Sequence, residues 1–368
     1  MILVDLSSTI HRMIHTAVRD SEPRLIDDKY VTADFIGLVK DNILRELFSI
    51  KQEHGNRFGD LVVCLDQSVN GYWRHDVLPS YKSSRKVQRE QNNIDFKEVF
   101  KEIDVLVSNI KANFPWKVIG VPRAEADDVI LVLARAFNSK EQVLIYSPDK
   151  DMIQAQRNTN SVFQYSGLTK KWIVPENKHD NMDEWIQEHV ILGDTSDGVP
   201  KVVDHTEFSD SFLEHLITNG FTEIKTPMDF DRVECNDDEK RRVLENFNVY
   251  KLNRKKESTG VLDVYKTTRF GPSTLKKQLD NYGSVDKWLD SHPLYREHYD
   301  RNFTLVMEEG IPDDIRDLII AEYSNAEDVY NEKEVRQYLT ENNLQQMLLE
   351  LPTHLKIDHE LTLNDLDW

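Results

Sequence analysis

The stretch Ala124-Glu125-Ala126-Asp127-Asp128 places three carboxylates within four residues, directly before the apolar run Val129–Leu133. A helix that begins here gains from acidic side chains in its first turn, because they meet the positive end of the helix dipole. Acidic residues also follow other short apolar runs along the chain. These are Asp5, Asp66, Asp149, Asp151, Asp194 and Asp197. Carboxylates gathered at strand ends are typical ligands of divalent cations, so the stretch predicts either a helix start alone or a helix start within a metal site.

Short apolar runs alternate with helix-like segments over the first two hundred residues. Buried strands are predicted at 2–4, 61–65, 116–121 and 142–146, with a lesser β pair at 162–165 and 172–174. Between them, segments such as 33–53 and 95–113 repeat apolar residues at helical spacing. Strands that alternate with helices form parallel sheets. We therefore predict an α/β fold with a mostly parallel central sheet flanked by helices.

Beyond about residue 203 the strand signal fades and helical spacing dominates. Candidate helices lie at 208–219, 237–248, 272–280, 300–309, 312–323 and 333–350. The sequence therefore predicts that a second, largely helical part follows the sheet.

Composition narrows the class of protein. No run of about 18 apolar residues occurs, so no membrane-spanning helix is expected. The first residues lack the basic start of a signal peptide, and Cys64 and Cys235 are too few for a disulfide framework, which fits a reducing cytoplasm. The net charge of −19 argues at first against a nucleic-acid partner. However, residues 307–368 hold 16 acidic and four basic side chains, which leaves only −7 for the other 306 residues.

Residues 70–92 differ from their surroundings, because basic residues alternate with aromatic ones and few residues are apolar. The basic and aromatic members include Tyr72, Trp73, Arg74, His75, Tyr81, Lys82, Arg85, Lys86 and Arg89. A solvated surface loop is one interpretation. The segment follows the predicted strand that ends at Asp66, and open α/β sheets bind ligands at the carboxyl ends of their strands. A phosphate-binding loop is therefore the second interpretation.

The strand-end carboxylates form the strongest chemical signal. Nine qualify: Asp5, Asp66, Glu125, Asp127, Asp128, Asp149, Asp151, Asp194 and Asp197. Crowding like charges without cations is costly, and hard oxygen ligands without cysteine or regular histidine spacing select Mg²⁺ or Mn²⁺ rather than Zn²⁺. Two such ions about 4 Å apart can hold a phosphodiester, one activating a water and the other stabilising the leaving oxygen. We predict two or more Mg²⁺ ions, with Mn²⁺ as a substitute.

An aspartate-dependent phosphatase is an alternative for the same acids. Asp149-Lys150-Asp151 has the form of a strand-end pair that supplies a nucleophile and an acid. This alternative leaves Glu125 and the acidic stretch around Asp194 without a role.

A second candidate site lies in the helical half, where Gly271 and Pro272 precede a predicted helix. The free amides of a helix start bind phosphate oxygens, and Ser273 and Lys276 stand beside them in the sequence. Proline is also usual in the first turn of a helix that binds nothing. Residue patterns alone leave both interpretations open.

In their order and spacing, the acidic motifs resemble those of the 5′-nuclease superfamily, which includes flap endonucleases and the 5′-nuclease domain of bacterial DNA polymerase I. The motifs are Asp5, Cys64-Leu65-Asp66, Glu125–Asp128, Ser147–Asp151 and Gly193–Pro200. Within the superfamily, residues 70–85 and 302–313 are most similar to the ribonuclease H branch of T-even bacteriophages. The resemblance spans about residues 1–325.

The resemblance implies a PIN-like fold and a Mg²⁺-dependent 5′→3′ exonuclease and flap endonuclease that removes RNA primers from lagging-strand fragments. It implies that the nine carboxylates hold the ions, with Asp194 and Asp197 acting partly through water. Lys82 and Arg85 match catalytic basic residues of the arch that meets the scissile phosphate. The implied nucleic-acid-binding residues are Tyr81, Arg74, Arg89, Lys255 and, in a helix-hairpin-helix motif, Gly271, Pro272, Ser273 and Lys276.

We predict three parts, of which the resemblance covers the first two and leaves out the tail beyond about residue 325. Residues 1–200 form the catalytic domain with the bridge-like segment 70–92, residues 201–325 form a helical DNA-binding domain, and residues 326–368 form an acidic helical tail. About 70 residues separate Pro200 from Gly271, where the family has a short link. Either an insertion at about 203–268 displaces the hairpin, or the Gly271 assignment is wrong.

The implied partners are branched or nicked duplex DNA and RNA–DNA hybrid, bound by a monomer away from any membrane, in the host-cell cytoplasm if a phage encodes the chain. The acidic and hydrophobic end Leu361–Trp368 either docks into a sliding clamp or a single-strand-binding protein, or packs on its own domain. A DNA-binding replication accessory that has lost catalysis is the alternative from another class. It fits less well, because every carboxylate position holds an acid.

Overall fold

The chain divides into two compact units that interleave along the sequence. The structure, a computed structural model, describes residues 1–20, 33–83, 85, 94–174, 182–203, 208–233, 237–255, 264–265, 269–327, 329–345, 347–348 and 351. The first unit comprises Met1–Asn70, Asn92–Pro175 and Pro312–Trp368, and the second comprises Gly71–Gln91 and Glu176–Ile311. The predicted boundaries near residues 200 and 325 concern functional domains and stay predictions.

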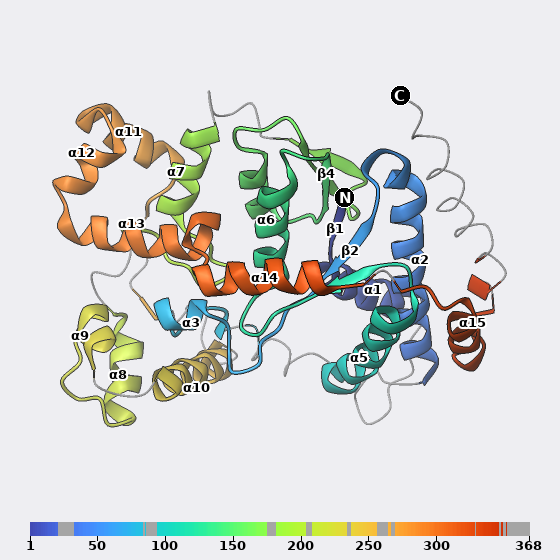
Figure 1. The fold of residues 1–368 in the computed structure, drawn as a ribbon. Helices are drawn as coiled ribbons and strands as arrows, with labels where there is room; N and C mark the ends of the chain where they lie inside the picture. The colour runs from blue at the N-terminus through green and yellow to red at the C-terminus, as the bar shows by residue number, and fades with distance from the viewer. Residues whose placement is uncertain are drawn as a thin grey trace. The chain divides into compact units, whose positions relative to one another are not determined.

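The first unit is built on a six-stranded sheet whose order is β3-β2-β1-β4-β5-β6. Figure 1 labels three of these strands, β1, β2 and β4. The strands are β1 (Ile2–Asp5), β2 (Leu61–Cys64), β3 (Lys117–Ile119), β4 (Val143–Tyr146), β5 (Val162–Ser166) and β6 (Lys171–Ile173). The first five are parallel, and β6 pairs antiparallel with β5. The predicted fold class, a mostly parallel α/β sheet, is confirmed, and each predicted strand is present within two or three residues of its expected bounds.

Helices cover both faces of this sheet. Those of the first unit are α1 (Leu6–Asp20), α2 (Ala33–Phe58), α5 (Phe96–Asn113), α6 (Ala126–Phe137), α14 (Asp313–Asn325) and α15 (Glu332–Glu341), with the 3₁₀ helix η1 (Lys150–Gln156). Buried residues of α1, α2, α5 and α15 share one hydrophobic cluster with Ile2 and Val4 of β1. Helix α6 packs against β1, β2 and β4 outside that cluster, and α14 packs on α6 (Figure 1).

Helix α1 is the one long element of the first unit that the sequence reading missed. It begins at Leu6, directly after β1, without any linking residue. Its buried residues Ile10, Met13, Ile14 and Ala17 do follow helical spacing. The signal was therefore present, but the adjoining strand left no turn residues to mark where the helix starts.

The second unit is helical where the structure describes it. Its elements are α3 (Arg74–Val77), α7 (Met182–Leu192), α8 (Asp210–Thr218), α9 (Pro227–Arg232), α10 (Asp237–Lys255), α11 (Pro272–Tyr282), α12 (Val285–Asp290), α13 (Pro293–Val306) and the short η2 (Glu308–Gly310). The predicted helices at 208–219, 237–248 and 272–280 are confirmed. No described helix is long and apolar enough to cross a membrane.

The described residues between Val203 and Phe270, where an insertion is predicted, have a core of their own. Val203 and Phe270 pack into one hydrophobic cluster with Trp288, although 66 residues separate them in the sequence. The described residues between them form a separate cluster that includes Phe208, Phe212, Phe230, Leu244 and Phe247. A β-bridge between Phe208 and Tyr265 joins the two ends of that cluster. We refer to residues 208–265 below as the inserted subdomain.

We expect Phe247→Ala to destabilise the inserted subdomain locally. Phe247 has no exposed surface, and emptying such a site costs about 3–5 kcal/mol. Because its cluster is separate from that of the sheet, amide hydrogen exchange should rise in α8 and α10 while β1 and β4 stay protected. The matched control is Phe114→Ala, which empties an equally buried site in the sheet cluster and should show the reverse pattern. Equal loss of protection in both units would contradict the separate core.

Candidate functional site

Asp5 stands at the centre of the carboxyl edge of the sheet. It is the last residue of β1, and only 6% of its surface is exposed. The amide of Ser8 donates to Asp5 Oδ1 at 2.9 Å, and the hydroxyl of Ser147 donates to Oδ2 at 2.9 Å. Ser147 directly follows β4, so this bond joins the ends of two neighbouring strands and orients the carboxylate.

Asp66 joins three further elements at the same edge. It lies two residues after β2, and its side chain is exposed. The hydroxyl of Ser7, in the first turn of α1, donates to Asp66 Oδ2 at 2.7 Å. The amide of Ala126, the first residue of α6, donates to Oδ1 at 2.7 Å. One carboxylate therefore connects the end of β2 with the starts of α1 and α6.

The acidic stretch at 125–128 begins α6 as the helix-start interpretation predicted. Glu125 is the N-cap residue, is 2% exposed, and forms a capping box with Asp128. The amide of Glu125 donates to Asp128 Oδ2 at 2.8 Å. Asp127 is half-buried beside them. The acids thus lie at the positive end of the α6 dipole.

The thiol of Cys64 reports how close two of these charges lie to the end of β2. Burial raises the pKa of Cys64 well above its ordinary value, and the negative charges of Asp5 and Asp127 raise it further. Asp5 and Asp127 come from different elements, so the fold does bring their charges to one place.

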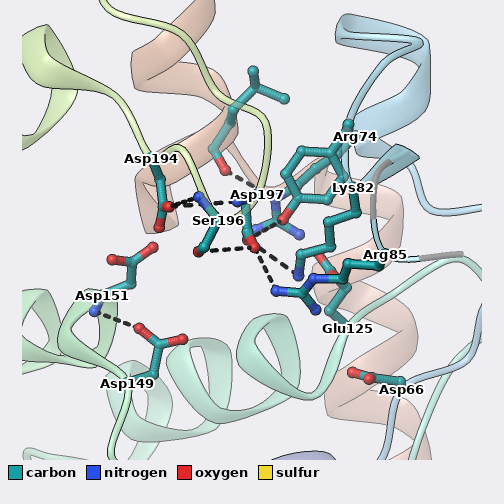
Figure 2. Close-up of polar contacts among 12 residues, drawn as sticks. Asp66, Arg74, Lys82, Arg85, Glu125, Asp149, Asp151, Asp194, Ser196 and Asp197 are labelled. Atoms are coloured by element: carbon teal, nitrogen blue, oxygen red, sulfur yellow. Dashed lines mark hydrogen bonds and ion pairs between the residues drawn. The ribbon is translucent and has the colours of Figure 1, made fainter. Parts of the chain in front are cut away.

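Asp149 and Asp151 lie at the start of η1, beyond the end of β4. The amide of Asp151 donates to Asp149 Oδ1 at 2.9 Å, which caps η1 (Figure 2). The amide of Asp149 in turn donates to the hydroxyl of Ser147 at 3.2 Å. Ser147 therefore contacts both Asp5 and Asp149, and it links the carboxylates that follow β1 and β4.

These contacts bring the strand-end carboxylates of the first unit to one edge without packing them into a cluster. In the part of the chain that the structure describes, no three Asp, Glu, His or Cys side chains are grouped closely enough to hold a metal ion. The nine-carboxylate metal site stays a prediction. Seven of its members belong to the first unit, whereas Asp194 and Asp197 belong to the second.

In the second unit, Asp197 is the centre of a cationic cluster. The hydroxyl of Tyr81 donates to Asp197 Oδ2 at 2.9 Å, Lys82 Nζ lies 3.1 Å from the same oxygen, and Arg85 Nη2 donates to Oδ1. Figure 2 shows Lys82 and Arg85 pointing toward this carboxylate. The side chains of Asp197 and Lys82 are only 16% and 10% exposed. The two basic residues predicted to be catalytic are thus held together by one acid.

The charge state of Asp197 follows from these contacts. Burial acts to raise the pKa of Asp197, but the charges of Lys82 and Arg85 and the hydrogen bond from Tyr81 outweigh it and lower the pKa below its ordinary value. Asp197 is therefore ionised at neutral pH and balances part of the charge of the two bases.

Backbone geometry holds the loop that carries these acids. Asp194 Oδ1 accepts hydrogen bonds from the amides of Ser196 and Asp197, and Asp194 bridges to Val199. Gly193 has a φ of +65°, and a Cβ at this position would lie 2.5 Å from the carbonyl oxygen of Pro200. Only glycine fits there, which explains the glycine of the acidic motif.

Two of the residues predicted to contact nucleic acid are buried in this structure, and their role in binding stays a prediction. Arg74 is 4% exposed, its Nε donates to the carbonyl oxygen of Leu305 at 2.8 Å, and its guanidinium lies over the ring of Trp73. Tyr81 is also 4% exposed and binds Asp197. Both residues belong to residues 70–92, which we call the basic segment. In this structure they support its described part from inside, because their polar groups bond to the protein itself.

The other residues predicted to contact nucleic acid either lie in helix α11 and its N-cap or have side chains outside the described part of the chain. Helix α11 begins at Pro272 with Gly271 as its N-cap, as predicted, and Ser273 and Lys276 are exposed in its first turns. Their role in binding stays a prediction. Lys255 is the last residue of α10, and its side chain is outside the described part of the chain, as is the whole of Arg89.

Sequence reasoning missed the neutral residues that orient the acids. Ser7, Ser8 and Ser147 donate to the carboxylates, and Asn302, which is fully buried, donates to the carbonyl oxygens of Val190 and Pro200 on either side of the acidic loop. The only available signal was the position of Ser7, Ser8 and Ser147 next to the acidic motifs. Nothing local in the sequence indicates which carboxylate each serine meets.

The geometry is that of an α/β fold with acidic residues at the carboxyl ends of its strands, and comparison with known proteins assigns the chain to a family. Residues 1–187 match the family described as "5'-3' exonuclease, N-terminal resolvase-like domain". The match covers half of the chain, so this protein belongs to the 5′-3′ exonuclease family. It is a nuclease of this family, and therefore a hydrolytic enzyme.

Individual relatives support the assignment. The chain is 29% identical to the ribonuclease H of Enterobacteria phage T4 over 251 residues, which is 67% of this chain and 77% of that protein. It is 31% identical to a 5′-3′ exonuclease of Mycoplasmopsis pulmonis over 144 residues, 38% of this chain and just under half (45%) of that protein. Among solved structures, the 5′-exonuclease of phage T5 has a similar fold, with a TM-score of 0.52 at 16% identity over 89% of this chain and 99% of that one.

We expect Asp197→Asn to destabilise the protein at neutral pH but not in acid. The folded-state pKa of Asp197 is lowered, so its stabilising effect is present above the unfolded value of about 4 and is lost as the pH falls through the folded value. At pH 7 the free energy of unfolding should fall by about 1–2 kcal/mol, a figure that allows for solvent screening at Arg85.

Urea unfolding of wild type and variant between pH 7 and pH 3 measures this difference. Asp280→Asn, at an exposed position of α11, serves as the control. If the difference between Asp197→Asn and wild type stayed constant down to pH 3, the ion-pair explanation would be wrong.

Proposed function

We propose that the protein is a Mg²⁺-dependent 5′→3′ exonuclease and flap endonuclease that removes RNA primers during lagging-strand replication. The observation that carries the proposal is the row of oriented carboxylates at one sheet edge, within the segment that matches the exonuclease family. The proposed substrates are duplex DNA and RNA–DNA hybrid with a free 5′ end or a 5′ flap. The T4 relative is itself named a ribonuclease H, which supports the inclusion of hybrid.

The donor chemistry of the sheet edge fits divalent ions. Asp5, Asp66, Glu125, Asp149 and Asp151 offer hard carboxylate oxygens from the ends of β1, β2 and β4 and from the start of α6. Asp66 and Asp149 are exposed, so they can turn toward an ion. The T5 exonuclease of similar fold was solved with zinc bound, which supports a divalent site of this kind. When bound, such ions supply an activated water and stabilise the leaving oxygen.

The remaining acids complete the proposed ligand set. Asp127 and Asp128 lie beside Glu125 at the start of α6. Asp194 and Asp197, from the second unit, are proposed to contribute through water, and for Asp197 this role is shared with binding of the two bases.

The basic side chains of Lys82 and Arg85 are proposed to bind the substrate phosphate. Lys82 and Arg85 carry two positive charges on a short segment, and Asp197 keeps both in place without neutralising them fully. A phosphodiester can form bidentate hydrogen bonds with the guanidinium of Arg85, while Lys82 offers a compact charge. Both side chains would stabilise negative charge as it develops on the scissile phosphate.

We expect Asp149→Asn to abolish cleavage and to leave binding of flap DNA largely intact. The change removes one charged metal ligand at the sheet edge, so the cleavage rate should fall more than about 100-fold. Excess EDTA should stop the wild-type enzyme in the same way. A 5′-labelled flap duplex with Mg²⁺ reports released oligonucleotides, and fluorescence anisotropy reports binding.

Asp104→Asn, at an exposed position of α5, is the matched control and should cleave as wild type does. Full activity of Asp149→Asn, or of wild type in excess EDTA, would overturn the metal assignment.

We expect Lys82→Ala to lower the cleavage rate about 100-fold, because one charge is lost at the scissile phosphate. Binding should also lose about one unit of its salt dependence, measured as the slope of log K against log salt concentration. Lys101→Ala removes a 67% exposed lysine of α5 and should change neither quantity. An unchanged cleavage rate in Lys82→Ala would remove this residue from the catalytic set.

The partner predictions extend this proposal. Docking to a sliding clamp or a single-strand-binding protein through Leu361–Trp368 concerns residues outside the described part of the chain. Together with a monomeric state and a cytoplasmic location, it is part of the proposal rather than of the observed structure.

A further inference from the structure

A hydrogen bond joins the inserted subdomain to the described part of the basic segment. Asn248 of α10 is 5% exposed, and its Nδ2 donates to the hydroxyl of Ser83 at 3.1 Å. Ser83 lies between Lys82 and Arg85, the two bases that bind Asp197. Both partners belong to the second unit, so the contact is internal to one compact body.

The same face of α10 also reaches the beginning of the segment. Both terminal nitrogens of Arg241 lie 3.7 Å from the position that a Cβ on Gly71 would occupy. Arg241 and Asn248 are seven residues apart, which places them two turns apart on one face of the helix. Helix α10 therefore lies beside residues 71–83 near both ends and is hydrogen-bonded to them at Ser83.

The segment needs such support because its backbone is strained. Lys82 has a φ of +52°, a left-handed conformation that costs a side-chain-bearing residue about 1–3 kcal/mol. The amide of Lys82 donates to the carbonyl oxygen of Asp197 at 2.8 Å, and the amide of Arg85 donates to the carbonyl oxygen of Lys82 at 3.1 Å. The direction of both bases thus depends on a short turn that includes Ser83.

We propose that Asn248 is a positioning residue, through which the inserted subdomain holds Lys82 and Arg85 in the orientation that binds the scissile phosphate. The inference rests on the proposed nuclease function and adds a role for the insertion. Asn248 acts through Ser83 and does not touch the substrate. The inserted subdomain, which folds around its own core, would thereby support the cationic side chains of Lys82 and Arg85.

The test measures cleavage and conformation separately in the full-length protein. Asn248→Ala and Ser83→Ala should each lower the single-turnover cleavage rate of a 5′-flap duplex at saturating enzyme about tenfold, with an unchanged melting temperature. The double variant should be no slower than either single one, because both changes break the same bond. Ser83→Thr keeps the hydroxyl and should restore activity. Val249→Ala, next to Asn248 on α10 but 40% exposed, is the matched control and should behave as wild type.

Hydrogen exchange gives a readout that does not depend on activity. Asn248→Ala should raise amide exchange over residues 72–83, including Lys82, while Val249→Ala should not. In an Arg85→Ala background, Asn248→Ala should slow cleavage less than it does in wild type. Unchanged exchange in Asn248→Ala, or fully additive losses in the double variant, would overturn the positioning role. If Asn248→Ala raised amide exchange but the wild-type protein cleaved no 5′-ended substrate, the proposed function would be rejected, while the contact between Asn248 and Ser83 would still stand.

Discussion

The parallel pairing of β1 with β2 on one side and β4 on the other is the constraint on which the candidate site depends. Asp5 pairs in register with Cys64, and Val4 with Tyr146, so all three strands end at one edge. Because parallel strands share a direction, every residue that follows a strand is delivered to that edge. The cost is a concentration of like charges. Ser147 and the amides at the starts of α1 and α6 offset part of it by donating to the carboxylates.

Charge balance in the second unit is arranged in a different way. Lys82 and Arg85 share one ionised acid, Asp197, so the three side chains together keep a net positive charge. A carboxylate that binds both Lys82 and Arg85 also has the shape and charge that a phosphate oxygen pair would present to them. The burial of Tyr81 and Arg74 adds rigidity from inside, since each satisfies its polar group on the protein itself.

The inserted subdomain shows how a long insertion can be accommodated without loss of the fold. The two ends of this subdomain lie close together. Phe208 and Tyr265 form a β-bridge, and Val203 and Phe270 pack in one hydrophobic cluster. The entropic cost of closing a loop grows slowly with its length, and a core of aromatic side chains more than offsets it. Whether this stretch displaces a helix-hairpin-helix motif to Gly271, and whether Gly271 binds DNA, both stay predictions.

The sequence by itself determined the strands, most of the helices and the acidic residues that follow the strands. Apolar runs that end in Asp5, Asp66 and Asp149 specified strands, sheet class and a carboxylate-rich edge, because periodicity and strand-end placement are local properties. Only the tertiary structure decided the partners. Ser147 meets Asp5 across 142 residues and Arg85 meets Asp197 across 112, and no local pattern records which distant segments come together. Burial was equally hidden, since Arg74 has the charge of a surface residue and became a packed one only when the chain folded around it.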